Sequence, residues 1–193
     1  FARQFKRQRL ATPLLPNTLE QPEHVALHLE HPCSASNGVV AVDQGRVVGY
    51  LCWFLVNNLR DTGRKGAYVP EWGNACIDED KAKIYAALYR AAGEQWAAAG
   101  CQMHAITFLA RDQVAERIWF WNGFGLTVVD AIRPAQLLEA PYEQLLKIRK
   151  ANAADAEAIT RLDAEHLEHY TSSPVFMPRR SADLAAVNTE FLS

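Results

Sequence analysis

The apolar positions of the chain follow two different periods, and together they predict an alternation of strands and helices. Two β-branched runs, residues 39–43 and 46–56, meet at Asp43-Gln44-Gly45 and predict an antiparallel hairpin, because a glycine suits such a turn. Residues 80–99 carry apolar side chains at helical spacing and end at Gly100, which predicts a helix. This combination favours a sheet with a helix packed on one face.

Shorter patterns complete this order. They predict a helix over 18–31 that starts with a Thr cap and a Pro, a strand over 67–77 that Pro70 interrupts, a strand over 101–110, a short helix over 111–122 and a strand over 126–134. The resulting fold class is α/β (α+β), with one mixed, mostly antiparallel sheet over residues 36–133 and flanking helices.

The pattern of apolar and polar residues changes after Pro134. Residues 135–146 read as a connector, and "KIRKANAADAEAITRLDAEHLEHY" from Lys147 predicts a short strand and an acid-started helix. The final stretch, "TSSPVFMPRRSADLAAVNTEFLS", is polar and weakly helical. Fewer than about 50 residues follow the connector, and a domain needs roughly 100–150. We therefore expect 147–193 to be the incomplete start of a second unit.

The same argument predicts that certain apolar side chains of the second unit are buried, because a lone strand and helix is not stable. These side chains are Ile148, Ile159 and Leu162. The chain begins at Phe1 rather than Met, so we also expect an upstream segment that supplies the opening strand of the first unit.

Composition and charge exclude several classes of protein. The 193 residues carry a net charge of −2 without a long basic stripe, so we expect no nucleic-acid partner, and "FARQFKRQR" is interpreted as a solvated helix end. No run approaches the roughly 18 apolar residues of a membrane span. The four cysteines are far apart, which indicates neither a zinc site nor a disulfide framework. These features indicate a cytoplasmic protein.

Aromatic side chains gather where the last predicted helix meets the following strand. The stretch "RIWFWNGFGLTVVDAIR" places Trp119, Trp121 and Phe124 around a glycine turn. Core packing is one explanation for these large aromatic side chains, since a helix that meets a sheet buries its last turn. A ligand beside the junction is the alternative explanation.

Two of these stretches resemble the GNAT superfamily of acetyl-CoA-dependent N-acetyltransferases. The hairpin reads "VAVDQGRVVGYL", and the helix and turn read "AERIWFWNGFG" with Ala115, Trp119, Gly123 and Phe124 at the family's spacing. The resemblance covers residues 36–133, and "KIRKANAADAEAITRL" is similar to the family's opening strand and helix. It thus implies a tandem member with acetyl-CoA as cosubstrate.

The resemblance also implies a chemistry and a set of site residues. An amine must lose a proton, the thioester oxygen must meet a backbone N–H, and the leaving thiolate must be protonated. The interrupted strand around Pro70 would supply the N–H, with Val69, Trp72 and Gly73 beside the coenzyme. Glu71 would be the general base, although an exposed strand carboxylate is the plainer explanation.

The chain departs from the family at the coenzyme loop. The loop's glycines would fall at Lys83 and Tyr85, and its Arg or Gln at Asp80, so none of the three matches. The carboxylates at positions 78–80 would instead repel a diphosphate at the helix start, where its N–H groups normally bind anions. We therefore expect weak coenzyme binding, which neutralising these three side chains should strengthen.

A second departure concerns the general acid. Trp119 stands where relatives often place a tyrosine, and an indole N–H cannot deliver a proton at neutral pH. His104 has an ionisation range suited to proton transfer, yet a core histidine is the simpler interpretation. Asp112 lies where relatives often carry an Asn near the coenzyme, and we favour a helix cap for it.

Two functional classes remain open. The first is an enzyme that acetylates an amine of a small molecule or peptide; the second is a catalytically degenerate module that dimerises or binds a small molecule. Histidines at 24, 28 and 31 could align metal ligands on one helix face, but nothing else in the sequence supports a metal and a solvated helix is preferred. We expect no metal and no membrane partner.

Overall fold

The computed structural model describes residues 1–135 and 146–172. The chain divides into two compact units, Phe1–Ile132 and Arg133–Ser193. Most of the predicted connector and of the final polar stretch lies outside the described residues.

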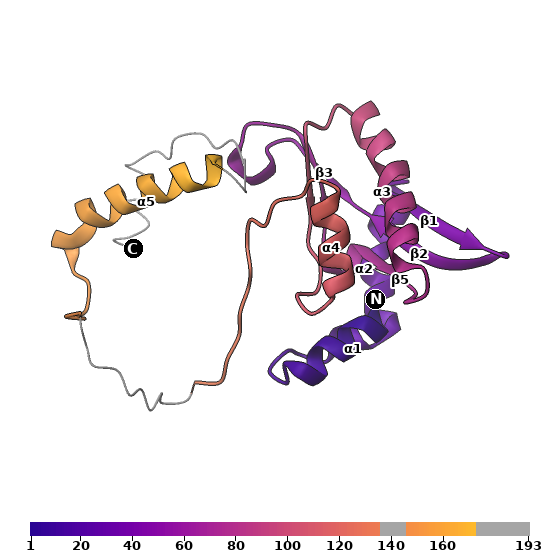
Figure 1. The fold of residues 1–193 in the computed structure, drawn as a ribbon, viewed down its shortest axis with the longest axis horizontal. Coiled ribbons are helices and arrows are strands. Elements are labelled where there is room, and N and C mark those ends of the chain that lie inside the picture. The colour runs from indigo at the N-terminus through magenta and orange to yellow at the C-terminus, as the bar shows by residue number, and fades with distance from the viewer. Residues whose placement is uncertain (136–145, 173–193) are drawn as a thin grey trace. The chain divides into compact units, whose positions relative to one another are not determined.

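The first unit alternates strands and helices much as the apolar pattern predicts (Figure 1). In chain order its elements are α1 (Ala2–Ala11), α2 (Pro22–Ser34), β1 (Gly38–Asp43), β2 (Arg46–Cys52), β3 (Phe54–Val56), β4 (Gly66–Val69), β5 (Asn74–Cys76), α3 (Lys81–Ala98), β6 (Met103–Ile106) and α4 (Gln113–Trp121). Single 3-10 turns lie at Thr18–Glu20, Leu59–Asp61 and Glu71–Gly73. The fold is a mixed α/β arrangement of mostly antiparallel strands flanked by helices.

The strands form two three-stranded sheets, with orders β1-β2-β5 and β3-β4-β6. The predicted hairpin is confirmed, since β1 and β2 pair antiparallel with Val39 opposite Leu51. The prediction of one continuous sheet is wrong. The chain leaves the first sheet at Trp53, between β2 and β3, and returns to it at β5 after Pro70. Proline has no N–H to donate, so the ladder cannot continue through that position.

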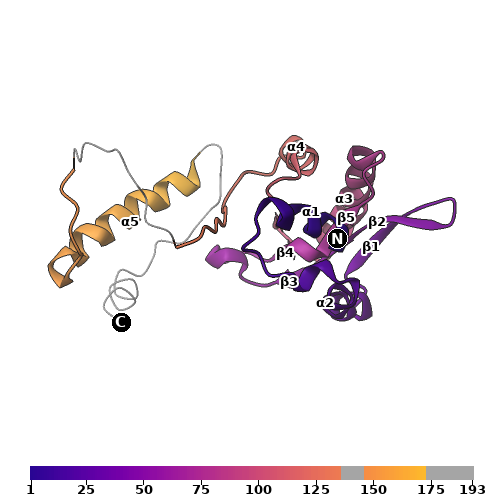
Figure 2. The ribbon, with the colours of Figure 1, turned by 90° about the horizontal axis from the view of Figure 1, so that it is seen from below.

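Helices cover both faces of the strands (Figure 2). In this view α3 and α4 lie above the strands and α2 lies below them. The core between α3, α4 and the strands contains Trp53, Trp96 and Trp119, each at most 2% exposed. The predicted amphipathic helix is therefore confirmed as α3, and it buries Tyr85 and Leu88 against this core.

The aromatic junction after α4 combines packed and exposed rings. Trp119 and Phe124 contact each other with ring centroids 5.7 Å apart, and Gly123 takes a φ of +87° that suits glycine. Trp121, in contrast, is 82% exposed. Core packing thus accounts for Trp119 and Phe124 but not for Trp121.

Two predicted elements differ from the structure. The strand over 126–134 is absent; that segment is irregular, and Leu126 and Val128 are about half exposed. The helix predicted over 18–31 begins later, because Pro22 occupies the first helical position after Gln21 and Thr18 belongs to a separate turn. Proline favours the first turn of a helix, so it sets this start.

The second unit contains a helix, α5 (Ala156–Thr171), preceded by a 3-10 turn over Ala153–Asp155. Asn152 and Asp155 form a reciprocal capping box at the start of this 3-10 turn. The helix prediction is confirmed, whereas the short strand predicted at 147 is not present in the described residues. Ile148 and Leu162 are 73% and 61% exposed, so the expected burial of these side chains is not found. None of the described helices is long and apolar enough to span a membrane.

Candidate functional site

The interruption at Pro70 separates two neighbouring segments of backbone. β4 pairs parallel with β6 as far as Val69 opposite Ile106, and Thr107 N then donates to Val69 O at 2.9 Å. After the turn, β5 pairs with β2 instead. Residues 74–80 begin with β5 and residues 107–112 follow β6; these segments, called the first and second arm below, therefore extend from strands of different sheets and diverge.

Asn74 joins the two arms at the point where they separate. Its side chain is buried, and its Nδ2 donates to Thr107 O at 2.8 Å and to Pro70 O at 3.2 Å. The turn beside it has no spare room, because a Cβ on Gly73 would lie 2.7 Å from Cys52 O. The interruption is therefore a tightly packed feature of the fold.

A cavity of about 10 Å³ lies between the arms. Its lining residues are Phe1, Gln4, Glu71, Asn74, Tyr85, Phe108, Leu109, Asp112 and Ala115. Such a volume holds little more than one water molecule. The predicted base Glu71 is half-buried here, and the Tyr85 hydroxyl donates to Asn74 Oδ1 at 3.4 Å. Burial raises the pKa of Tyr85, so its hydroxyl stays protonated.

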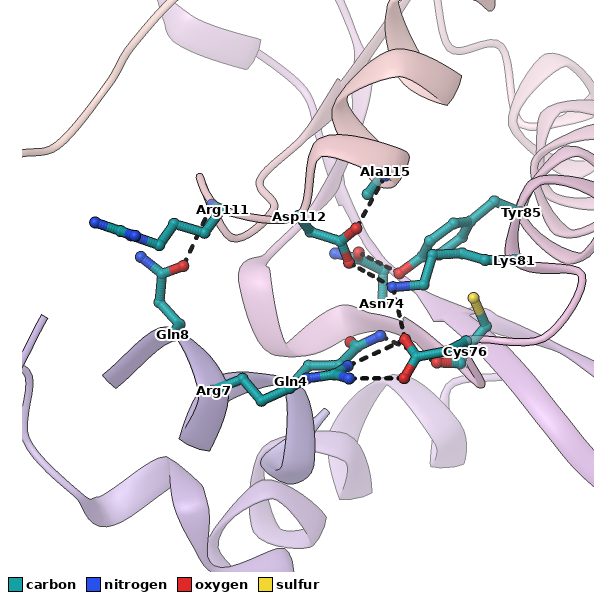
Figure 3. Close-up of polar contacts among 11 residues, drawn as sticks. Gln4, Arg7, Gln8, Asn74, Cys76, Lys81, Tyr85, Arg111, Asp112 and Ala115 are labelled. Atoms are coloured by element: carbon teal, nitrogen blue, oxygen red, sulfur yellow. Dashed lines mark hydrogen bonds and ion pairs between the residues drawn. The ribbon is translucent and has the colours of Figure 1, made fainter. Parts of the chain in front are cut away.

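Helix α1 closes this cavity by binding both arms, as Figure 3 shows. Gln4 Nε2 donates to Cys76 O on the first arm at 3.0 Å. On the second arm, Arg111 N donates to Gln8 Oε1 at 3.3 Å. Two side-chain amides of α1 thus satisfy one backbone group on each arm. The basic start of the chain is consequently a docked helix rather than a solvated one.

An ion pair strengthens the contact with the first arm. The guanidinium of Arg7 binds both carboxylate oxygens of Asp78, at 2.7 and 3.1 Å. This hydrogen bond, together with Lys81, lowers the pKa of Asp78 to about 2. Asp78 is therefore a charged partner of α1 at neutral pH.

The ammonium of Lys81 links the starts of α3 and α4. Its Nζ lies 2.8 Å from Asp112 Oδ2 and 3.2 Å from Asp78 Oδ1, and the side chain is only 7% exposed. Burial alone would lower the pKa of Lys81, but the two carboxylates raise it above the ordinary value. The preference for Asp112 as a helix cap is confirmed, since its Oδ1 accepts from Ala115 N at 3.0 Å.

These contacts change the electrostatics expected at the start of α3. Asp80 pairs with Lys83 at 2.8 Å, and Asp78 pairs with Arg7 and Lys81. Two of the three carboxylates at positions 78–80 are therefore neutralised by neighbouring cations. The expected repulsion of a diphosphate by these carboxylates, and the stronger binding expected when they are neutralised, stay predictions.

Trp72 lies beside the site but faces a different set of rings. Its side chain stacks on His28 at a centroid distance of 5.1 Å and meets Phe54 edge-on at 5.8 Å. Its carbonyl accepts from the Tyr50 hydroxyl at 2.8 Å. His28 is thus part of an aromatic cluster, and the described residues contain no group of three candidate metal ligands.

Two predicted catalytic residues do not line the cavity. His104 on β6 binds the Tyr89 hydroxyl through Nδ1 at 3.1 Å, and burial lowers its pKa. Trp119 is fully buried, and its Nε1 has no hydrogen-bond partner in the described structure. Both side chains pack in the core, so the structure does not bring them to Glu71.

A larger groove of about 690 Å³ runs between α3 and α4. It is lined by Ala82, Ala86, Gln113, Val114, Arg117, Ile118, Trp121 and Asn122. The guanidinium of Arg117 and the exposed ring of Trp121 give this groove a cation and a stacking surface. Both are groups that bind nucleotides.

Sequence analysis missed three residues that organise the site, namely Asn74, Lys81 and Tyr85. Asn74 is a polar residue within a β-rich run, and its amide could have suggested a special role. Lys81 was given no role, and Tyr85 was considered only as a position where a glycine of the coenzyme loop would fall. Nothing local in the sequence indicates their partners.

No family model matches this chain, and no curated protein matches it either. Similar solved structures include a probable acetyltransferase, 12% identical, which covers 72% of this chain and 91% of its own with a TM-score of 0.46. An aminoglycoside acetyltransferase from an uncultured soil metagenomic sample is 16% identical over 57% and 74% (TM-score 0.43). A transcriptional regulator from Bacillus halodurans C-125 is 18% identical over 59% and 76% (TM-score 0.45).

Proposed function

We propose that the first unit transfers an acetyl group from acetyl-CoA to an amine of a small molecule or peptide. The observation that carries this proposal is the divergence of the two arms at Pro70, with a carboxylate, Glu71, and a hydroxyl, Tyr85, on the same cavity. The resemblance of "VAVDQGRVVGYL" and "AERIWFWNGFG" to the N-acetyltransferases supports the same chemistry.

The arms fit the coenzyme only when α1 moves away. Gln4 and Gln8 use side-chain amides to satisfy one backbone group on each arm, and the coenzyme's pantetheine chain carries two amides of the same kind. The backbone of Val69, Gly73 and Cys76 would then hold it. Its nucleotide half would bind in the groove beside Arg117 and Trp121. When bound, the coenzyme supplies an activated acetyl thioester.

Two side chains of the cavity would each transfer one proton. The carboxylate of Glu71 accepts the proton that the amine loses as the N–C bond forms, directly or through one water. The hydroxyl of Tyr85 donates a proton to the departing sulfur as the C–S bond breaks. Tyr85 replaces Trp119 in this role, because a hydroxyl can deliver a proton and an indole cannot at neutral pH.

The second candidate function is a non-catalytic module. It is favoured by the closure of the cavity, since α1 leaves only about 10 Å³ between the arms. A protein that keeps the fold for binding or dimerisation has no need to open this contact.

One experiment decides between the two. Calorimetry with acetyl-CoA, and thiol release with a panel of amines, are measured for the wild type, Arg7→Gln and Lys6→Gln. Arg7→Gln weakens closure and is expected to bind acetyl-CoA several-fold more tightly than the wild type. Lys6→Gln makes the same charge change at an exposed position of α1 and should behave like the wild type. Absence of binding and turnover in all three would refute acetyl transfer and leave the binding module.

We also propose that α5 opens a second unit of the same type. The support is the likeness of "KIRKANAADAEAITRL" to the family's opening elements and the capped turn that leads into the helix. Limited proteolysis tests the proposal. Ready cleavage at 140–146 that leaves the melting temperature of the remaining 1–140 fragment unchanged would show that the segment is a dispensable tail.

A further inference from the structure

Two cysteines that are distant in the sequence meet where α2 folds back on β2. Cys33 lies in the last turn of α2, and Cys52 is the final residue of β2. The short return between them is held by the backbone: Asn37 N donates to Pro32 O at 2.8 Å, and Gly38 pairs directly with Cys52. This register places the end of α2 over the end of β2.

The two thiols differ in their surroundings. Cys33 is exposed, whereas Cys52 is 4% exposed. Burial, followed by the charge of Cys33 and a side-chain hydrogen bond with it, raises the pKa of Cys52 to about 12. Burial, followed by the charges of Cys52 and Cys33, also raises the pKa of Tyr50.

The neighbouring strand leaves room around the Cys52 sulfur. The strand partner of Cys52 is Gly38, and a Cβ there would lie 3.0 Å from Cys52 Sγ. Glycine therefore leaves space for the sulfur on this side of the strand. An exposed thiol near a buried one is the arrangement that an attacking and a resolving cysteine require.

We propose that Cys33 and Cys52 are a redox modification site that closes to a reversible disulfide when the protein meets a hydroperoxide. The Cys33 thiol loses its proton, its sulfur attacks one peroxide oxygen and the O–O bond breaks; the departing hydroxide takes up the proton, so a sulfenic acid and one water result. The sulfur of Cys52 then attacks Cys33, its proton leaves with the hydroxyl as a second water, and the S–S bond forms. Two thiols are oxidised while one peroxide is reduced to two waters.

The disulfide joins α2 to β2 close to the candidate site. Trp72, which follows Glu71, stacks on His28 of the same helix. Oxidation thus fixes the helix that packs against the Glu71–Gly73 turn. It also closes the loop between Cys33 and Cys52, so the melting temperature should rise by about 5 °C.

The test uses the reduced full chain treated with hydrogen peroxide. The wild type is expected to lose two of its four free thiols, to lose the mass of two hydrogens, and to yield one cross-linked peptide joining Cys33 and Cys52; dithiothreitol restores all four thiols. Cys33→Ser should lose the cross-link, and Cys101→Ser should keep it as the matched control.

Other products would overturn the proposal. These are oxygen added to Cys33 without a cross-link, a cross-link through Cys76 or Cys101, or a disulfide between two chains. Cys52→Ser is expected to stop at an oxidised Cys33. Should that variant fail to fold, Cys33→Ser still decides the matter, because its exposed position tolerates serine. The outcome is independent of acetyl transfer and does not bear on it.

Discussion

The Nζ of Lys81 lies 2.8 Å from Oδ2 of Asp112 and so joins the first residue of α3 to the cap of α4. Both side chains are largely buried, at 7% and 17% exposure. A buried charge without its partner is costly, and these two charges hold the second arm against the helix that follows the first arm. The pair therefore supports the geometry of the cavity more than it supplies chemistry.

The first prediction concerns this pair. Lys81→Met should lower the free energy of unfolding by about 2 kcal/mol, less than for a fully buried pair because Asp112 keeps some contact with water. Asp112→Asn should cost about 1 kcal/mol, since asparagine still caps α4. Urea unfolding of both single variants and of the double variant measures the coupling. Strictly additive effects would show that the two charges do not support each other.

The second prediction is a pH dependence. Arg7 and Lys81 hold the pKa of Asp78 at about 2, below its ordinary value of 3.8. The stabilisation is therefore complete above about pH 4 and is lost as the pH falls through about 2. Asp78 is 55% exposed, so the contribution stays below about 1 kcal/mol.

Urea unfolding of the wild type and of Arg7→Gln between pH 6 and pH 2 tests this dependence. The wild type should be more stable at pH 6, and the difference should shrink with acidification. Lys6→Gln is the matched control and should show no such trend. A difference that grows toward pH 2 would mean that another group controls the contact.

The third prediction compares two glycines. A Cβ on Gly73 would lie 2.7 Å from Cys52 O, whereas a Cβ on Gly93 meets nothing within 4 Å. Gly73→Ala should therefore destabilise the protein by about 2 kcal/mol through overpacking. Gly93→Ala lies within α3 and should stabilise it by about 0.5–1 kcal/mol. The midpoints of urea unfolding report both, and equal shifts would contradict the packing described at Pro70.

Local patterns predicted the elements whose contacts are close in sequence. The β1–β2 hairpin follows from Gly45 between two β-branched runs, and the end of α3 from Gly100, because a turn and a helix each depend on neighbouring residues. The helix cap at Asp112 could also be predicted from the sequence, because its partner, Ala115, is only three residues away. The sequence predicts the interruption of the strand at Pro70. It does not indicate the sheet to which β5 returns.

The rest depends on contacts between distant residues. Lys81 and Asp112 are 31 positions apart, and no local pattern pairs them. For the segment 126–134, in contrast, the local pattern predicted a strand that is absent. Its β-branched residues suit a strand, yet β-propensity mostly expresses packing against neighbours, and here Val128 and Val129 are 52% and 62% exposed.

The fourth prediction follows from that exposure. Val128→Lys and Val129→Lys should each change the free energy of unfolding by less than about 0.5 kcal/mol, because neither side chain is buried. Leu51→Ala, at a fully buried position of β2, should cost about 2–5 kcal/mol in the same urea assay. A loss above about 1 kcal/mol at Val128 or Val129 would indicate that the segment pairs with a strand.

The last prediction tests the proton donor in the proposed acetyl transfer. The Tyr85 hydroxyl lines the cavity between the arms, whereas Trp119 is buried in the core and does not. Tyr85→Phe should lower kcat about 10²-fold or more, the lower range for a general acid, with little change in KM for acetyl-CoA. Trp119→Phe is the matched control, because it should lower the melting temperature while kcat stays within about threefold. The kcat and the melting temperature, measured together for both variants, separate chemistry from packing. If Trp119→Phe lowers kcat more than Tyr85→Phe does, the donor lies elsewhere and the role of Tyr85 is confined to its hydrogen bond with Asn74.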